Sequence, residues 1–312
     1  MTTLRQAVQD YLRMRRNLGF KLRNAGKGLL DFANFMDQHH ATYITQALAL
    51  DWAKQPLHAQ AAHWAQRLSF VRGFAQYRSA TDPRTQIPAQ GLLPARPKRA
   101  YLYSDTEIRG LLNAALKMPY RYERGTLRPW VYYCLFGLLS VTGLRLGEAQ
   151  DLELQDIDLQ AAVLTIRGAK FGKTRLVPLD RSTCRVLAEY IRRRNRHWGQ
   201  RPVSPHLFVS SSGHRLDGAD IRRTFYALSR QIGLRSPSAS HGPRLHDLRH
   251  RFATRTLVRW YRSNQDPERK LPLLSAYLGH AHVADTQWYL NSSPELMCEA
   301  MHRLEHRWGD RP

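Results

Sequence analysis

The sequence predicts a mainly α-helical protein with one small β-sheet, an α+β fold divided into two domains. Three observations predict this fold class. Apolar residues recur at helical spacing through most of the 312 residues. A proline-rich stretch, residues 82–103, interrupts the helical pattern. A single segment, residues 161–179, is β-rich on both sides of a polar centre.

Residues 1–82 form the first predicted domain, which reads almost wholly as amphipathic helices. Because residues three and four apart share one face of a helix, the apolar positions indicate which faces are buried. We therefore expect a small helical bundle. The positions that indicate it are Leu4, Val8, Tyr11 and Leu12, then Leu29, Leu30, Phe32 and Phe35, then Trp64, Leu68, Val71 and Phe74.

Residues 83–103 form the predicted linker, since this stretch is rich in proline and shows no period. A helix start follows immediately. Ser104 can cap a helix while the side chain of Glu107, three residues later, reaches back to it. The second predicted domain therefore spans residues 104–312.

Most of the second domain is also expected to be helical. The apolar run of residues 129–144 is shorter than the roughly 20 residues that cross a bilayer, so it indicates a core helix, and no membrane partner is expected. Residues 161–179 predict a β-hairpin whose turn carries Lys170, Gly172 and Lys173. Helical patterns resume around residues 180–196, 217–232, 244–260, 271–279 and 295–307.

The charge of the chain indicates its partner. The sequence has 48 Lys and Arg against 25 Asp and Glu, a formal net charge of +23. The excess is spread out, because residues 1–100 alone hold 15 basic and 5 acidic residues. Nucleic acid is the expected partner, contacted by both domains.

Three widely spaced cysteines and the lack of a secretory signal pattern predict reduced thiols in an intracellular compartment.

The stretch "RLHDLRHRFATR", residues 244–255, concentrates cations on one predicted helix. His246, Arg249 and His250 fall on one face at helical spacing. Leu245 and Leu248 can point into a core instead. We therefore expect the cationic face to look outward at a bound partner.

Four motifs resemble the signature boxes of the tyrosine recombinase, or phage integrase, family, in the family's order and spacing. They are "TGLRLGE" (residues 142–148), "GAKFGKTRLVPL" (residues 168–179), "HDLRH" (residues 246–250) and "YLGHAHVADTQWYL" (residues 277–290). The resemblance extends from about Ser104 to Leu290. The N-terminal pattern, with "YLRMRRNLGF" followed by "LLDFANFM", is similar to the helical core-binding domain of that family.

The resemblance implies a site of six catalytic residues that needs no metal and no cofactor. Five of them surround a DNA phosphate, and the sixth, a tyrosine, attacks it. Glu148 and Asp247 are expected to orient arginine and histidine side chains rather than to catalyse. The six implied catalytic residues are Arg145, Lys170, His246, Arg249, His280 and Tyr289.

Elementary chemistry supports these roles. Negative charge builds on the non-bridging oxygens during exchange at a phosphodiester, and a planar guanidinium can hold those oxygens through paired hydrogen bonds. Arg145 and Arg249 fit that role. Lys170 aligns with the family's catalytic lysine and is preferred over Lys173 as the general acid that protonates the leaving 5′-oxygen. His246 can act as a base or phosphate ligand, and His280 as a further donor.

The resemblance also implies partners and setting. The expected partner is double-stranded DNA, bound by a homo-oligomer with a dimer at each site and a tetrameric synapse. The expected reaction is strand exchange between short core sites in the bacterial cytoplasm, on the nucleoid. Residues 261–280, "YRSNQDPERKLPLLSAYLGH", are longer than in compact Xer-type members. This length favours an integrase of a mobile element.

Other interpretations remain open from the residues alone. Arg145 can be a surface arginine paired with Glu148, and Tyr289 can be a core aromatic residue. A DNA-binding regulator without catalysis would use the same fold passively. A metal-dependent nuclease could use His246, His250 and the histidines of "GHAH". Carboxylate ligands are scarce around these histidines, and nearby arginines repel cations.

Overall fold

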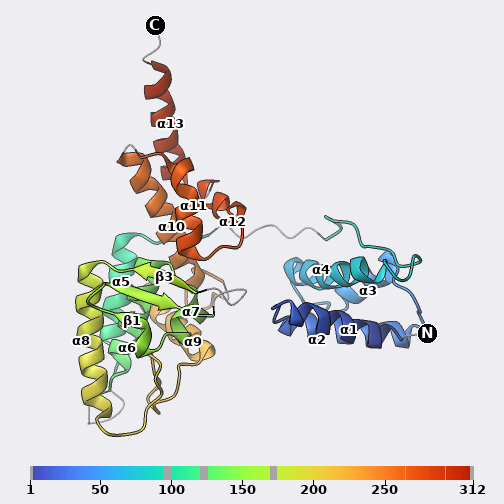
Figure 1. Ribbon diagram of the computed structural model, residues 1–312, viewed down its shortest axis with the longest axis horizontal. Coiled ribbons are helices and arrows are strands. Elements are labelled where there is room, and N and C mark those ends of the chain that lie inside the picture. The colour runs from blue at the N-terminus through green and yellow to red at the C-terminus, as the bar shows by residue number, and fades with distance from the viewer. Residues whose placement is uncertain are drawn as a thin grey trace. The chain divides into compact units, whose positions relative to one another are not determined.

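The computed structural model describes residues 3–93, 100–119, 126–168, 174–239, 241–263, 265–291 and 293–309. The chain divides into two compact units, residues 1–98 and 99–312 (Figure 1). The division falls within residues 83–103, the predicted linker. Each unit has an apolar core of its own.

The first unit consists of helices, as the apolar spacing predicts. They are α1 (Leu4–Asn17), α2 (Arg23–Gln38), α3 (Gln46–Lys54) and α4 (Ala61–Arg78). The hydroxyls of Thr3 and Thr45 cap α1 and α3 by accepting backbone N–H groups of the first turn. The core is aromatic at its centre, where Phe32, Trp52 and Phe74 are fully buried. That this unit binds DNA stays a prediction.

The second unit is mainly helical with a small sheet, which confirms the predicted fold class (Figure 1). The Ser104 hydroxyl accepts the Glu107 backbone N–H, and the Glu107 carboxylate accepts the Ser104 N–H, so the predicted capping box opens the first helix. The helices are α5 (Asp105–Leu116), α6 (Arg128–Thr142), α7 (Leu146–Asp151), α8 (Arg181–Trp198), α9 (Gly218–Gln231), α10 (Leu245–Arg262), α11 (Pro267–Leu278), α12 (Ala284–Gln287) and α13 (Pro294–Gly309), with 3₁₀ helices η1 (Leu154–Asp156) and η3 (Trp288–Asn291).

The predicted apolar core helix is α6. Its buried side chains include Val131, Leu135, Phe136 and Leu139, and it packs between α5 and α10. Among the residues that the structure describes, no helix combines the length and the apolar character needed to cross a membrane.

The sheet has three antiparallel strands in the order β1 (Ile157–Asp158), β2 (Val163–Ile166) and β3 (Arg175–Pro178). The β2–β3 hairpin confirms the predicted one, with Ile166 opposite Arg175 at the turn end. β1 was not predicted, because a strand of two residues shows no recognisable alternation. Residues 169–173, including Lys170 and Lys173, lie outside the described residues.

A smaller apolar cluster lies beside the main core of the second unit. It gathers side chains from α10 (Ala253, Leu257 and Val258), α11 (Leu271, Leu274 and Leu278), η3 (Tyr289) and α13 (Leu296). Tyr289 is 3% exposed within this cluster. The packing of α10, α11 and α13 therefore sets the position of the tyrosine.

Candidate active site

Two helix C-termini meet at the centre of the site. α6 ends at Gly143 with φ 63°, and α11 ends at Gly279 with φ 68°. Glycine adopts this left-handed conformation without the strain that a side chain brings. The last carbonyl groups of a helix lack intrahelical partners and carry the negative end of the helix dipole. The two ends therefore present oxygens that attract cations.

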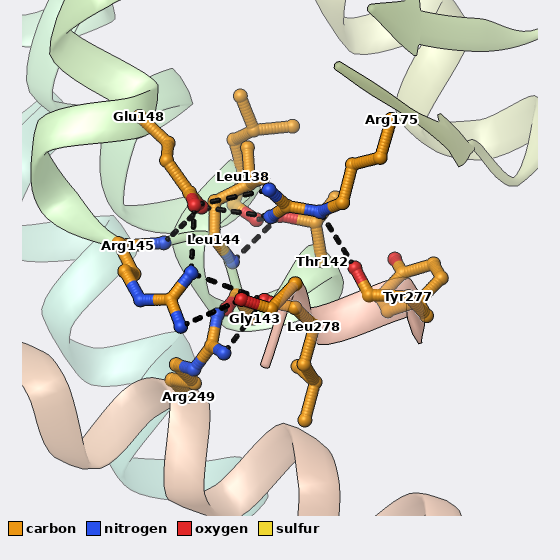
Figure 2. Close-up of polar contacts among 11 residues, drawn as sticks. Leu138, Thr142, Gly143, Leu144, Arg145, Glu148, Arg175, Arg249, Tyr277 and Leu278 are labelled. Carbon is orange, nitrogen blue, oxygen red and sulfur yellow. Dashed lines mark hydrogen bonds and ion pairs between the residues drawn. The ribbon is translucent and has the colours of Figure 1, made fainter. Parts of the chain in front are cut away.

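Arg249 of α10 joins these two ends. Its guanidinium donates through Nη1 to the Gly143 carbonyl at 2.8 Å and through Nη2 to the Leu278 carbonyl at 2.7 Å (Figure 2). The residue is only 2% exposed. Burial of a cation is costly unless its donors are satisfied, and the carbonyls of the helix ends satisfy two of them. The position of Arg249 thus depends on both helix ends.

Burial corrects one sequence-based expectation. Arg249 and His250 do not look outward, because both are buried, and His246 alone of the predicted cationic face is exposed. Helical spacing predicted the shared face but not the carbonyl oxygens that face Arg249. A buried arginine became possible only because segments distant in sequence supply those acceptors.

Arg145 also contacts the end of α11. It directly precedes α7 and donates to the Leu278 carbonyl at 3.3 Å (Figure 2). It also donates to the Gly279 carbonyl at 3.0 Å. It also pairs with Glu148 at 2.9 Å, as the surface-pair interpretation expected. Its side chain is 34% exposed, so this guanidinium is open to solvent. The Leu278 carbonyl accepts from both Arg145 and Arg249, which brings two positive charges together.

Burial and the charged neighbours of Arg249 shift the pKa of its guanidinium. Burial and the neighbouring charge of Arg145 lower the pKa of Arg249, while its hydrogen bond with Tyr289 opposes this shift. A guanidinium nevertheless stays charged at every pH at which proteins are folded.

Glu148 holds Arg145 in place together with Arg175, which is not among the site residues predicted from the sequence. Arg175 donates to both carboxylate oxygens of Glu148, at 3.0 and 2.8 Å. Burial alone would raise the pKa of Glu148, but hydrogen bonds from Arg175 and Arg145 bring this pKa below its ordinary value. The carboxylate is therefore ionised at neutral pH.

The signal for Arg175 lies in the strand pattern. In β3, Arg175 and Val177 share the inward face, while Leu176 is 63% exposed. From its apolar character, the alternation of a strand would have predicted a buried Leu176 and an exposed Arg175. A basic residue that shares a strand face with a buried valine points inward and needs a partner of opposite charge. This reasoning could have pointed to a carboxylate near the hairpin.

His280 and Tyr289 lie beside the arginines. The two rings are nearly parallel, with centroids 6.0 Å apart and an interplanar angle of 16°. His280 Nδ1 lies 2.7 Å from the Thr286 hydroxyl. Burial, followed by the charges of Arg249 and Arg145, lowers the pKa of His280 to about 4. His280 is therefore neutral at neutral pH.

The remaining histidines connect to the tyrosine by ring contacts. His250 lies 4.7 Å from His246 and 5.4 Å from Tyr289, between ring centroids. Burial and then the neighbouring His246 lower the pKa of His250 to about 4. Packing against its neighbours and the charge of Arg249 lower the pKa of His246, although this residue is still exposed to solvent. Asp247 pairs with Arg244.

The structure thus brings four of the six implied residues into one group, namely Arg145, Arg249, His280 and Tyr289. His246 adjoins this group through His250. Lys170 lies outside the described residues. Within the described part of the chain, no three residues among His, Cys, Asp and Glu are grouped so that they could hold a metal ion.

Comparisons with known proteins identify the family of the chain. Residues 106–295 match the phage integrase family. The chain is 66% identical over 313 residues to y4rB of Sinorhizobium fredii (strain NBRC 101917 / NGR234), which carries the name integrase/recombinase, with full coverage of both chains. It is 30% identical over 241 residues to the tyrosine recombinase XerC of Pseudomonas entomophila (strain L48), covering 76% of this chain and 72% of that one.

Solved structures share the fold. The Tn1549 transposon integrase in complex with transposon right end DNA superposes with a TM-score of 0.71 at 16% identity, covering 98% of this chain and 99% of that one. A lambda integrase dimer bound to a COC′ core site gives a TM-score of 0.61 at 17% identity, covering 93% and 77%. From its family match, its relatives and its fold, the chain belongs to the phage integrase family and is a tyrosine-type site-specific recombinase.

Proposed function

We propose that the protein cuts and rejoins DNA at short core sites through a 3′-phosphotyrosyl link at Tyr289. The observation that carries this proposal is the grouping of Arg145, Arg249 and His280 around Tyr289, with a hydrogen bond between Arg249 and the tyrosine side chain. Two guanidiniums suit a phosphate whose non-bridging oxygens gain negative charge. The tyrosine beside them suits a nucleophile.

In the proposed reaction the Tyr289 oxygen bonds to phosphorus and the bond from phosphorus to the 5′-oxygen breaks. Lys170 gives its proton to that oxygen, and the proton of the Tyr289 phenol passes to a base, for which His246 is the candidate. The phosphotyrosyl bond keeps the energy of the broken phosphodiester, so a 5′-hydroxyl can later attack it without ATP. Neither a metal nor a cofactor takes part.

The histidines have supporting roles in this proposal. Neutral His280 donates to the phosphate through Nε2 when the Thr286 hydroxyl donates to Nδ1, since one ring nitrogen of a neutral histidine carries the proton. His246 is exposed at the edge of the group and acts as a phosphate ligand or as the base for Tyr289. Arg249 has two donors on carbonyls, which leaves others of its five for Tyr289 and the phosphate.

A DNA duplex with a nick in the spacer tests the proposal. After cleavage, the short piece of strand between the cleavage site and the nick diffuses away, so no 5′-hydroxyl remains to reverse the reaction and the covalent complex is trapped. We expect an adduct that resists denaturation and forms in EDTA. A DNA-binding regulator would bind the duplex without forming an adduct. A metal-dependent nuclease would cut without an adduct and would stop in EDTA.

Replacement of Lys170 tests the general acid. Lys170→Ala should slow adduct formation about 10²- to 10⁴-fold, the typical contribution of a positioned acid. DNA with sulfur in place of the bridging 5′-oxygen has a leaving group that hardly needs a proton, so the variant should cleave it nearly as fast as the unmodified protein. Lys173→Ala is the matched control. A Lys170 variant equally slow on both substrates would move the acid elsewhere.

Both units are proposed to clamp the DNA, with residues 1–82 as the core-binding domain and residues 104–312 as the catalytic domain. Since positive charge occurs in both, affinity for duplex DNA should fall steeply with salt through counterion release. Fragments 1–95 and 100–312 should each bind more weakly than the whole chain in a titration at fixed salt. Equal affinity of fragment 100–312 and the whole chain would contradict the clamp.

A dimer at each site and a tetrameric synapse are proposed to assemble through α13. One face of this helix packs against the rest of its own unit. Leu296 lies in the cluster around Tyr289, and Glu299 pairs with Arg262. The opposite face exposes Met297, Met301 and Leu304, which suits docking on a neighbouring protomer.

A charge on that apolar face should therefore block assembly. Met301→Glu is expected to bind a single site normally and to lose synapsis and recombination, as measured by gel mobility of the protein–DNA complexes. His302→Glu, exposed on another face of the same helix, is the matched control and should assemble. Normal synapsis by the Met301 variant would remove α13 from the interface.

We further propose that a mobile element of a bacterial genome encodes the protein, which then works in the cytoplasm on the nucleoid. The extended segment of residues 261–280 supports this origin. Inverted repeats flanking a short spacer beside the gene would identify the substrate. A gene with neither such repeats nor element boundaries nearby would count against the proposal.

A further inference from the structure

Arg175 makes three hydrogen bonds that join parts of the site far apart in sequence. Its side chain, 12% exposed, donates from Nη1 and Nη2 to Glu148 and from Nε to the Tyr277 carbonyl at 2.8 Å (Figure 2). Arg175 stands on β3, Glu148 on α7 and Tyr277 on α11. The β-hairpin is thereby fixed to both helices that frame Arg145.

Three consecutive carbonyls at the end of α11 are bound by three arginines. Arg175 binds the Tyr277 carbonyl, Arg145 and Arg249 share that of Leu278, and Arg145 binds that of Gly279. The guanidinium of Arg175 also lies against Gly279, since a Cβ added there would come within 2.8 Å of its Nη1. Arg175 thus packs against the turn whose other oxygens hold the two arginines.

Glu148 receives four hydrogen bonds, two from each arginine. Oε1 accepts from Nη1 of Arg145 and Nη1 of Arg175, and Oε2 accepts from the Arg145 backbone N–H and Nη2 of Arg175. The Glu148 side chain is 9% exposed, so water cannot easily replace a lost partner. Without Arg175 the carboxylate would be free to turn towards Arg145 and draw its guanidinium away from Leu278 and Gly279.

We propose that Arg175 is a positioning residue for strand cleavage: it fixes Glu148 and the end of α11, and through them the guanidinium of Arg145. This inference rests on the proposed function. Arg175 acts on the phosphate through Arg145 and does not serve as the proton donor.

The physical basis is the shape of the guanidinium. Arginine presents a rigid fork that serves both oxygens of a carboxylate and a carbonyl at once, whereas the lysine ammonium is a single point of charge. Arg175→Lys therefore keeps the charge beside Glu148 and loses the geometry. A displacement of about 1 Å in a group that holds a reacting centre can cost about 10²-fold in rate.

The experiment compares Arg175→Lys with Arg167→Lys. Arg167 belongs to the same hairpin and pairs with a carboxylate, that of Asp156, but its side chain is 58% exposed and it contacts neither Glu148 nor α11 in any hydrogen bond of the described residues. Adduct formation is measured in a single turnover with saturating nicked duplex, alongside DNA affinity and the midpoint of thermal unfolding.

Arg175→Lys is expected to slow adduct formation about 10- to 10²-fold at unchanged DNA affinity, with a thermal midpoint well above the assay temperature. Arg167→Lys should match the unmodified protein. The defect of Arg175→Lys should remain on the substrate with the 5′-bridging sulfur, because phosphate activation is still needed there.

Three results would overturn the inference. The first is cleavage by Arg175→Lys at the unmodified rate. The second is a slow rate that weaker DNA binding or unfolding explains. The third is full recovery of the rate on the sulfur substrate, which would place the effect at the proton donor. The unmodified protein separates the two proposals. If it forms no adduct at all, the proposed function fails, whereas a normal adduct with an unaffected Arg175 variant defeats only this inference.

Discussion

Tyr289→Phe is expected to bind its DNA site with the affinity of the unmodified protein and to form no covalent adduct. The phenol oxygen is the proposed nucleophile, and a phenylalanine ring keeps the packing in the cluster of α10, α11 and α13. A phenol also leaves more readily than an aliphatic alcohol when a DNA 5′-hydroxyl attacks in the reverse step, because its unperturbed pKa is only about 10. Adduct formation on nicked duplex measures the effect.

The matched control is Tyr277→Phe. Tyr277 lies near the end of α11, packs against the same apolar cluster as Tyr289, and stacks on Phe252 with ring centroids 5.3 Å apart. Burial raises the pKa of Tyr277 to about 12, so its phenol ionises less readily than that of an ordinary tyrosine. The control should form the adduct. Loss of the adduct in Tyr277→Phe together with its persistence in Tyr289→Phe would reverse the assignment.

Arg249→Lys and Arg249→Ala should bind DNA and lose most of the adduct. Removal of one preorganised donor to a developing oxyanion costs about 10²- to 10³-fold in rate, and Arg249 also holds Tyr289. The alanine variant in addition leaves the Gly143 and Leu278 carbonyls without their partner in the buried centre of the site. We therefore expect lower thermal stability for alanine than for lysine.

The rate at saturating DNA is the relevant measurement for Arg249, with the thermal midpoint recorded for each variant. Arg255→Ala is the control on the same helix, since Arg255 is half-exposed and pairs with Asp105 away from the site. An Arg249→Lys variant that is folded and cleaves at the unmodified rate would contradict the role of this guanidinium in phosphate activation.

Local signals predicted the parts of the fold that depend on neighbouring residues. Ser104 and Glu107 marked the start of α5, a continuous apolar run located α6, and helical spacing located α10. The β2–β3 hairpin followed from its β-rich flanks. β1 was not predicted because it has only two residues. The start of α11 was also not predicted, although Asp266 caps this helix and Pro267 opens it.

Contacts between distant segments could not be predicted in this way. The resemblance to the recombinase family implied that Arg145 and Arg249 act together. Their shared acceptor, the Leu278 carbonyl, belongs to the end of a helix and lies 133 residues beyond Arg145. Arg175 was missed for the same reason, since Glu148 precedes it by 27 residues. Main-chain acceptors leave no mark in a sequence, so the burial of Arg249 became evident only from the fold.

The central claim, a phosphotyrosyl link at Tyr289, is tested most directly by peptide mapping of the trapped adduct. The complex formed on nicked duplex in EDTA is digested with protease and nuclease, and the peptide that retains a nucleotide is sequenced by mass spectrometry. We predict a single modified peptide with the 3′-phosphate of the cleaved strand on Tyr289. A nucleotide attached to any other residue, or through a 5′-phosphate, would contradict the account.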